Sequence, residues 1–212
     1  MTVDGRLARG DRTRAAALDA AVVLATEAGL HGLSLAQLAD TLGVSKSGLF
    51  AHWRSKEALQ LAAIDRAVEQ WQERIVAPAL HAPRGVRRLL ALHEARIDFY
   101  AARVLPGGCF FANTQFEYNA RPGPVRDRLA EAFGRWTAFL EQLVQQAVDA
   151  GELAAGTDVA QLAYEIDALG MSAAMHSRLL DPDAAYRHAR QGLLTRLRAL
   201  CPDPNLLTEG PS

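Results

Sequence analysis

Apolar residues recur at helical spacing along almost the whole chain, and this pattern limits the possible folds more than any other feature of the sequence. Alanine, leucine, arginine, glutamate and glutamine fill the periodic segments, and all of them favour helices. Glycine and proline fall mostly between those segments, and β-branched residues never form the alternating run of a half-buried strand. The sequence therefore predicts an all-α protein.

Turn residues and capping signals divide the chain into about nine predicted helices. The first four are expected to cover residues 11–28, 34–42, 45–53 and 55–77. The other five are expected to cover residues 85–104, 110–119, 125–150, 158–179 and 183–200. The remainder, residues 202–212, is predicted to be a loose tail.

The composition excludes several classes of protein. With 212 residues, 50% of them hydrophobic, and a net charge of −1, the chain can bury one or two cores and does not have the profile of a disordered protein. Its two cysteines, Cys109 and Cys201, are too few for a disulfide framework. Its apolar stretches are short and interrupted by charge, so we expect a cytoplasmic protein with no membrane span and no secretory signal.

Positive charge is concentrated in the N-terminal quarter. Residues 1–56 hold seven basic and five acidic side chains, whereas the rest of the chain holds 16 basic and 19 acidic ones. The only two lysines, Lys46 and Lys56, lie in this quarter, among 21 arginines in the whole sequence. The N-terminal quarter therefore differs electrostatically from the rest of the chain, and the alternative explanation for the position of the lysines is chance in an arginine-biased sequence.

Residues 35–53 have the layout of a helix-turn-helix. Ser34 and Gln37 form a capping box for the first helix, Gly43 permits a sharp turn, and Val44 is expected to be buried against the first helix. Ser45 is expected to begin the second helix, which in this motif lies in the major groove of DNA.

The second helix of this motif has one small, polar face. Leu49 and Trp53 are expected to point inward, and the outer surface is predicted to consist of Lys46, Ser47, Gly48, Ala51 and His52. Small side chains allow the helix axis to approach the base edges, but they make few strong contacts. Specific binding would therefore require a dimer.

These residues resemble the DNA-binding domain of the TetR family of bacterial transcriptional regulators. The resemblance covers about residues 11–60 and rests on the stretches LSLAQLA (33–39), LGVSKSGLFAHW (42–53) and SKEAL (55–59). The rest of the chain resembles the family's all-helical ligand-binding and dimerisation domain in length and helix count. The stretches PGGCF (106–110) and RPGPV (121–125) resemble one large subgroup of these regulators.

The resemblance implies specific contacts with DNA. Lys46 and Ala51 match positions that touch bases or nearby phosphates, and His52 and Lys56 match positions that touch phosphates. Phe50 replaces the more usual tyrosine, so one hydroxyl that could bind a phosphate is missing. The candidate DNA-contacting residues are Ser34, Gln37, Ser45, Lys46, Ser47, Gly48, Phe50, Ala51, His52 and Lys56.

Two further basic features bear on DNA binding. Lys56 lies in the first turn of the predicted fourth helix, where a cation opposes the helix dipole unless a phosphate neutralises it. The arginines of a basic arm over residues 1–11, together with those at positions 12 and 14, are expected either to reach DNA or to be solvated. We expect a DNA-binding domain over residues 1–56 and a ligand-binding and dimerisation domain over residues 57–212, joined by the helix at 55–77.

Aromatic residues are dense between positions 85 and 150. They are interpreted as core or as the lining of a pocket for an apolar or aromatic small molecule. The candidate ligand-binding residues are Phe99, Cys109, Phe116, Trp136, Phe139, Met175 and His176. Cys109 follows Pro-Gly-Gly near a predicted helix start, where a thiol can be reactive, or it is a small residue packed in a tight space.

The last two predicted helices carry apolar stripes. They are expected to form a two-fold four-helix seam between two copies, with packing inside one chain as the alternative. The candidate interface residues are Leu162, Ile166, Leu169, Ala173, Tyr186, Leu193 and Leu197.

The function that these observations favour is a homodimeric repressor that binds a palindromic DNA operator and leaves it when a small effector binds. The alternative is a thiol-based redox or electrophile sensor on the same scaffold, acting through Cys109. The sequence shows no metal-ligand spacing, phosphate-binding loop or nucleophile elbow, so we expect no metal, no cofactor and no enzymatic activity.

Overall fold

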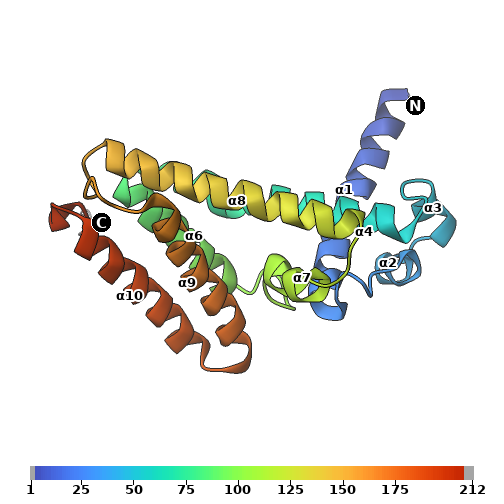
Figure 1. The fold of residues 1–212 in the computed structure, drawn as a ribbon. Helices are drawn as coiled ribbons and strands as arrows, with labels where there is room; N and C mark the ends of the chain where they lie inside the picture. Colours follow the sequence, from blue (N-terminus) through green and yellow to red (C-terminus); the bar gives the residue numbers. More distant parts are fainter. Residues whose placement is uncertain (1–2, 208–212) are drawn as a thin grey trace. The chain divides into compact units, whose positions relative to one another are not determined.

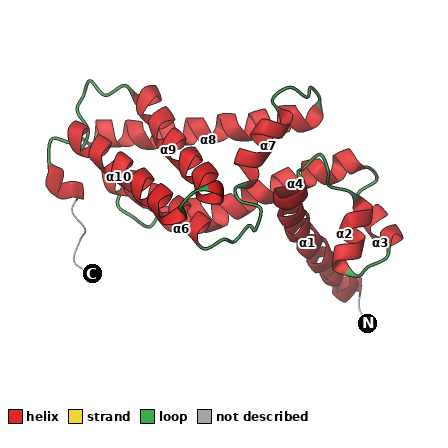
Figure 2. Cartoon of the chain, turned by 90° about the horizontal axis from the view of Figure 1, so that it is seen from below, coloured by secondary structure: helices red, strands yellow, loops and turns green. Residues whose placement is uncertain are grey.

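The computed structural model describes residues 3–207, with side chains described from Arg14 onward. Every regular element within those residues is helical, as expected (Figures 1 and 2). The N-terminal helices are α1 (Val3–Ala28), α2 (Leu35–Leu42), α3 (Lys46–Phe50) and α4 (Lys56–Trp71), followed by the π-helical segment η1 (Gln72–Val76) and the short α5 (Ala77–Ala79). The later helices are α6 (Val86–Ala101), α7 (Phe110–Tyr118), α8 (Pro124–Asp149), α9 (Val159–Leu179) and α10 (Pro182–Leu200), with a final 3₁₀ turn η2 (Pro204–Leu207).

The nine predicted helices correspond to α1–α4 and α6–α10, but three expectations about boundaries were wrong. Helix α1 begins at Val3 and not near Asp11, so residues 3–10 of the expected arm belong to the helix. The fourth helix does not end before Pro78, since a π-helical turn carries the chain into α5. The predicted loose tail is ordered as far as η2, where Leu207 is buried.

The chain divides into two compact units. One comprises the residues up to Gln70 together with Leu105–Ala130, and the other comprises Trp71–Val104 together with the residues from Glu131 onward. Helix α7 therefore belongs to the same unit as the helix-turn-helix, although it lies far away in the sequence.

The core of the first unit is built from the apolar stripes of its helices. Val22 of α1, Leu38 of α2, Leu49 of α3 and Leu59 of α4 are all fully or almost fully buried. Trp53, which follows α3, is also buried, as predicted, and the Arg14 guanidinium carbon lies 6.0 Å from its ring centre.

The core of the second unit lies between α6, α9 and α10, which run side by side (Figure 2). Its buried side chains include Leu89, Leu92, Ile97, Leu162, Ile166, Leu193 and Leu197. Capping side chains fix where α9 and α10 begin, because Asp158 accepts a hydrogen bond from the Gln161 backbone N–H and Asp181 accepts one from that of Asp183. None of the helices within the described residues is long and apolar enough to cross a membrane.

Candidate functional site

The turn of the helix-turn-helix is set by Gly43. Its φ of 63° lies in the left-handed region, and its N–H donates to the Asp40 carbonyl at 3.3 Å, while the Val44 N–H donates to the Ala39 carbonyl at 3.1 Å. These two bonds form the glycine-dependent cap that ends many helices, and they aim the chain toward α3. Val44 was expected to be buried, but 41% of its surface is exposed, because Leu49 and not Val44 occupies the inward position.

The outer face of α3 has the predicted composition. Ser45 caps the helix, its Oγ accepting from the Gly48 N–H at 3.2 Å. Leu49 and Trp53 point into the core, while the small and basic residues expected on the outer surface are all exposed: Lys46, Ser47, Gly48, Ala51 and His52. A helix with this face can approach a surface closely with few side chains in between.

The remaining candidate DNA-contacting residues differ in their availability. Ser45, Phe50 and Lys56 are exposed. Ser34 and Gln37 are half-buried, and the Ser34 Oγ already accepts a hydrogen bond from the Gln37 N–H at 3.2 Å. The contact that the structure shows for these two residues is therefore the N-terminal cap of α2.

Both lysines lie at the start of a helix. Lys46 is the first residue of α3, and Lys56 is the first residue of α4, where the Ser55 Oγ accepts from the Ala58 N–H at 3.0 Å. The N-terminus of a helix carries partial positive charge, so a cation there raises the local positive potential instead of neutralising it. Such a site attracts phosphate.

This geometry agrees with two family models. The model described as "Bacterial regulatory proteins, tetR family" matches residues 17–63, which contain the helix-turn-helix. The model described as "Tetracyclin repressor-like, C-terminal domain" matches residues 85–193. The chain belongs to the TetR family. It is therefore a DNA-binding transcriptional regulator.

Known proteins that resemble this TetR-family chain include regulators with the same fold. It is 28% identical over 162 residues to the HTH-type transcriptional repressor ComR of Escherichia coli K12. This match covers 75% of this chain and 77% of ComR. It is similar in structure to a TetR transcriptional regulator from Chloroflexus aurantiacus, with a TM-score of 0.83 and 27% identity over 91% of this chain and 98% of the other. It also has the fold of AibR, solved in complex with isovaleryl coenzyme A and operator DNA, with a TM-score of 0.66 and 21% identity over 88% of this chain and 97% of AibR.

Helix α7 supports the helix-turn-helix from the side. The two Glu117 carboxylate oxygens accept hydrogen bonds from the backbone N–H groups of Leu30 and His31, at 2.8 and 2.7 Å. The Gln60 amide of α4 donates to the Leu30 carbonyl at 2.7 Å and to the Tyr118 hydroxyl at 3.1 Å. The loop between α1 and α2 is thus held by α7 and by α4. The sequence did not reveal this role of Glu117, because its partners are backbone groups 86 and 87 residues away.

A second contact joins the loop before α7 to the end of α1. The Gly107 N–H donates to Thr26 Oγ1 at 3.1 Å, and the Asn113 amide donates to the Thr26 carbonyl at 3.2 Å. A Cβ at Gly107 would lie 1.9 Å from the Thr26 carbonyl oxygen, so the close approach of the two segments requires glycine at this position. Cys109 is only 3% exposed in this loop, which fits the interpretation that it packs in a tight space.

Three of the candidate ligand-binding residues come together in the second unit, around Arg96. The guanidinium donates to Asp167 Oδ1 and to the Tyr100 hydroxyl, both at 2.8 Å, and its carbon lies 5.4 Å from the centre of the Trp71 ring and 5.7 Å from that of Trp136. Trp136 also donates to Asp167 Oδ1 at 2.8 Å. The cluster also includes Phe139, whose ring centre lies 6.0 Å from that of Trp136, and Phe99, whose ring centre lies 6.3 Å from that of Trp71.

The Arg96–Asp167 pair was not expected, although the sequence holds a signal for it. Arg96 falls on the buried face of α6, between Leu92 and Ile97 and the aromatic residues that follow. A cation on an apolar face requires a partner. The pattern could therefore have shown that a buried ion pair was needed, but not that Asp167 supplies it.

The other candidate ligand-binding residues are not brought together. Phe116 is 60% exposed and lies, like Cys109, in the first unit. Met175 and His176 are exposed on α9, and His176 lines a groove of about 370 Å³ between α9 and α10. Among the residues that the structure describes, no group of three or more His, Cys, Asp or Glu side chains could hold a metal ion.

The side chains of the candidate interface residues face the core of the second unit. Leu169 is half-buried, whereas the other six are buried within the chain: Leu162, Ile166, Ala173, Tyr186, Leu193 and Leu197. Helices α6, α9 and α10 bury these stripes against one another. These six residues therefore pack inside one chain, which was the alternative interpretation. A second copy of the chain would have to contact a different face of α9 or α10.

Proposed function

We propose that this regulator is a cytoplasmic, homodimeric repressor that binds a palindromic operator and is released by a small apolar or aromatic molecule. The observation that carries the proposal is the face of α3, where exposed small residues and Lys46 surround a helix that is fixed by buried Leu49 and Trp53. A rigid helix with a small, basic outer face suits entry into a major groove.

Lys46 and Lys56 are the residues expected to contribute most of the phosphate contacts. Each begins a helix, and neither has an ion-pair partner in the part of the chain that the structure describes. His52 and Ala51 lie on the same exposed face of the motif. Phosphate contacts made by lysine release counterions, so operator affinity should fall steeply as salt is raised.

The dimer is expected to use the outward face of α9. Tyr164 is 69% exposed, Leu179 is 90% exposed, and Met175 lies between them on the same side, three turns from Tyr164. Exposed apolar residues gathered on one helix face favour a protein interface. A two-fold dimer would also present two α3 helices to successive major grooves, about 34–36 Å apart.

Two segments of the chain can carry the effector signal to the DNA-binding unit. The family model for the C-terminal domain includes α7, yet Glu117 of α7 binds the loop that precedes α2. Helix α4 binds the same loop through Gln60. The likeness to AibR, whose structure contains both an acyl coenzyme A and operator DNA, supports an effector-dependent mechanism. An effector acts only through its different affinities for the two states of the protein.

The proposal is tested by binding of the full-length protein to the DNA upstream of its own gene at two salt concentrations, with an unrelated fragment for comparison. We expect specific binding, and we expect Lys46→Ala and Lys56→Ala each to weaken it. Because each substitution removes one phosphate contact from both protomers of the dimer, each should reduce the salt slope by about two. Arg84→Ala, which removes an exposed cation from the loop before α6, is the matched control and should change neither quantity. Unchanged affinity and salt slope in both lysine variants would contradict the assigned contacts.

A further inference from the structure

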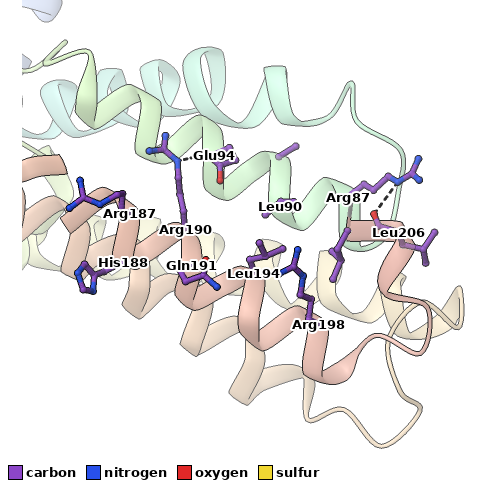
Figure 3. A pocket seen from close by; sticks show the side chains of 12 residues that line it. Arg87, Leu90, Glu94, Arg187, His188, Arg190, Gln191, Leu194, Arg198 and Leu206 are labelled. Carbon is purple, nitrogen blue, oxygen red and sulfur yellow. Dashed lines mark hydrogen bonds and ion pairs between the residues drawn. The ribbon is translucent and has the colours of Figure 1, made fainter. Parts of the chain in front are cut away.

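A large groove outside the helix-turn-helix unit has no assigned function. It lies between α6 and α10, has a volume of about 1060 Å³, and is closed at one end by η2 (Figure 3). Its floor is apolar and consists of Leu90, Ala91, Leu194, Leu206 and Leu207. A volume of this size is at the upper end of the range for small-molecule sites.

The groove is lined by four arginines and only one acid. Arg87 lies near the start of α6, and Arg187, Arg190 and Arg198 lie along α10, while Glu94 is the one carboxylate in the lining. The chain as a whole has a net charge of −1, so this concentration of positive charge is local.

The two ends of the groove differ in how far this charge is neutralised. At one end, Arg190 forms ion pairs of 2.6 Å with Glu94 and with Asp98, which place two carboxylates there, while Arg187 has no ion pair among the described residues. At the other end, the Arg87 Nε donates to the Leu206 carbonyl at 3.1 Å, and Arg198 has no partner among the described residues. Since α6 and α10 run in opposite directions, Arg87 and Arg198 lie at the same end, where the lining holds no carboxylate.

The apolar floor extends from this cationic end toward Arg187. Arg187 and Arg198 are 11 residues apart on α10, which corresponds to three turns and about 17 Å along one helix face. Leu194 lies between them on α10, and Leu90 lies opposite on α6 (Figure 3). A ligand that matches this pattern is long and apolar, with one anionic end.

We propose that the α6–α10 groove binds an extended aliphatic carboxylic acid. Its carboxylate lies at the Arg87–Arg198 end, and its hydrocarbon chain lies over Leu90, Ala91 and Leu194. Charge complementarity selects the carboxylate, and the apolar floor selects the chain. This site is separate from the operator contacts and from the aromatic cluster around Arg96.

The test is isothermal titration of the full-length protein with dodecanoate below its micelle concentration, compared with dodecan-1-ol. We expect one dodecanoate to bind per chain and the alcohol to bind about tenfold or more weakly, because it cannot form charged hydrogen bonds. Arg198→Ala should weaken dodecanoate binding by about tenfold or more, and Arg198→Lys should restore part of it. Arg187→Ala, at the opposite end of the same groove, is the matched control and should change affinity less than about threefold.

Several results would overturn the proposal. They are the absence of saturable binding, equal binding of acid and alcohol, or a loss in Arg187→Ala as large as that in Arg198→Ala. A change of oligomeric state in Arg198→Ala without any dodecanoate binding would instead identify the groove as an interface between two copies. Operator binding is measured separately, so failure of this proposal does not affect the repressor assignment, and the reverse is also true.

Discussion

The hydrogen bonds of Glu117 permit a quantitative prediction about how α7 supports the DNA-binding motif. Its carboxylate accepts from the N–H groups of Leu30 and His31 at 2.8 and 2.7 Å. Leu30 is completely buried, so removing the acceptor leaves a buried N–H without a partner, at a cost of about 1–3 kcal/mol. His31 is exposed, so water can replace its bond and little is lost there.

We therefore expect Glu117→Ala to destabilise the loop between α1 and α2 by about 2 kcal/mol. Glu117→Gln keeps one acceptor oxygen without the charge and should cost about 1 kcal/mol or less. Because the chain has two compact units, global unfolding need not be a single transition, so a local measurement is better.

Amide hydrogen exchange measures this loop directly. In Glu117→Ala the Leu30 amide should exchange about 30-fold faster, because a destabilisation of about 2 kcal/mol corresponds to a factor of about 30. The change in Glu117→Gln should be smaller. Gln115→Ala alters an exposed residue of the same helix and serves as the control for general effects on α7. If Leu30 exchange in Glu117→Ala matched that of the control, the carboxylate would not hold the loop and the coupling through α7 would be refuted.

Three further predictions concern other parts of the chain. Leu179→Glu places a charge on the most exposed apolar side chain of α9 and should convert the proposed dimer to monomers in sedimentation experiments, whereas Leu80→Glu, at another exposed leucine, should not. Burial, and secondarily the charge of Arg96, lowers the pKa of His93 from 6.5 to about 4. As the pH falls below 6.5, His93 therefore takes up a proton in the unfolded state but stays neutral in the folded state. The free energy of unfolding should therefore drop by about 2 kcal/mol between pH 7.5 and pH 5 because of this residue, and His93→Leu should remove that part of the dependence in urea titrations. Gly107→Ala forces a Cβ to within 1.9 Å of a backbone oxygen at the end of α1 and should cost about 1–3 kcal/mol, measured by urea unfolding, and an unchanged midpoint would show that the loop can move aside.

The sequence predicts helices and the DNA-binding face well because both depend on local pattern. Ser34, Gly43 and Ser45 fix the helix-turn-helix within a few residues of themselves, through bonds to backbone groups three to five positions away. Leu49 and Trp53 then have to point inward, since they are four residues apart on one face.

Prediction fails where the deciding contact is distant in the sequence or where one pattern serves two structures. The apolar stripe of α9 that includes Leu162 and Ile166 suits a dimer seam as well as an internal core, and only the position of α6 and α10 decides between them. The same holds for Arg96, whose buried place on α6 implies a partner but does not identify Asp167 across 71 residues.

The placement of α7 gives the proposed effector a route to the DNA-binding motif. By sequence family α7 is part of the C-terminal domain, but its Glu117 and the preceding Gly107 bind the end of α1 and the loop that leads into α2. That loop ends at Ser34, the cap that begins α2, so any rearrangement of α7 changes the constraint on the start of the DNA-binding motif. These hydrogen bonds are few and are made to backbone groups. Their loss can shift the equilibrium between the bound and the displaced position of α7 by about 1–3 kcal/mol, which is the size of a typical coupling energy between two sites. An effector that favours a displaced α7 by this amount would weaken operator binding without touching α3.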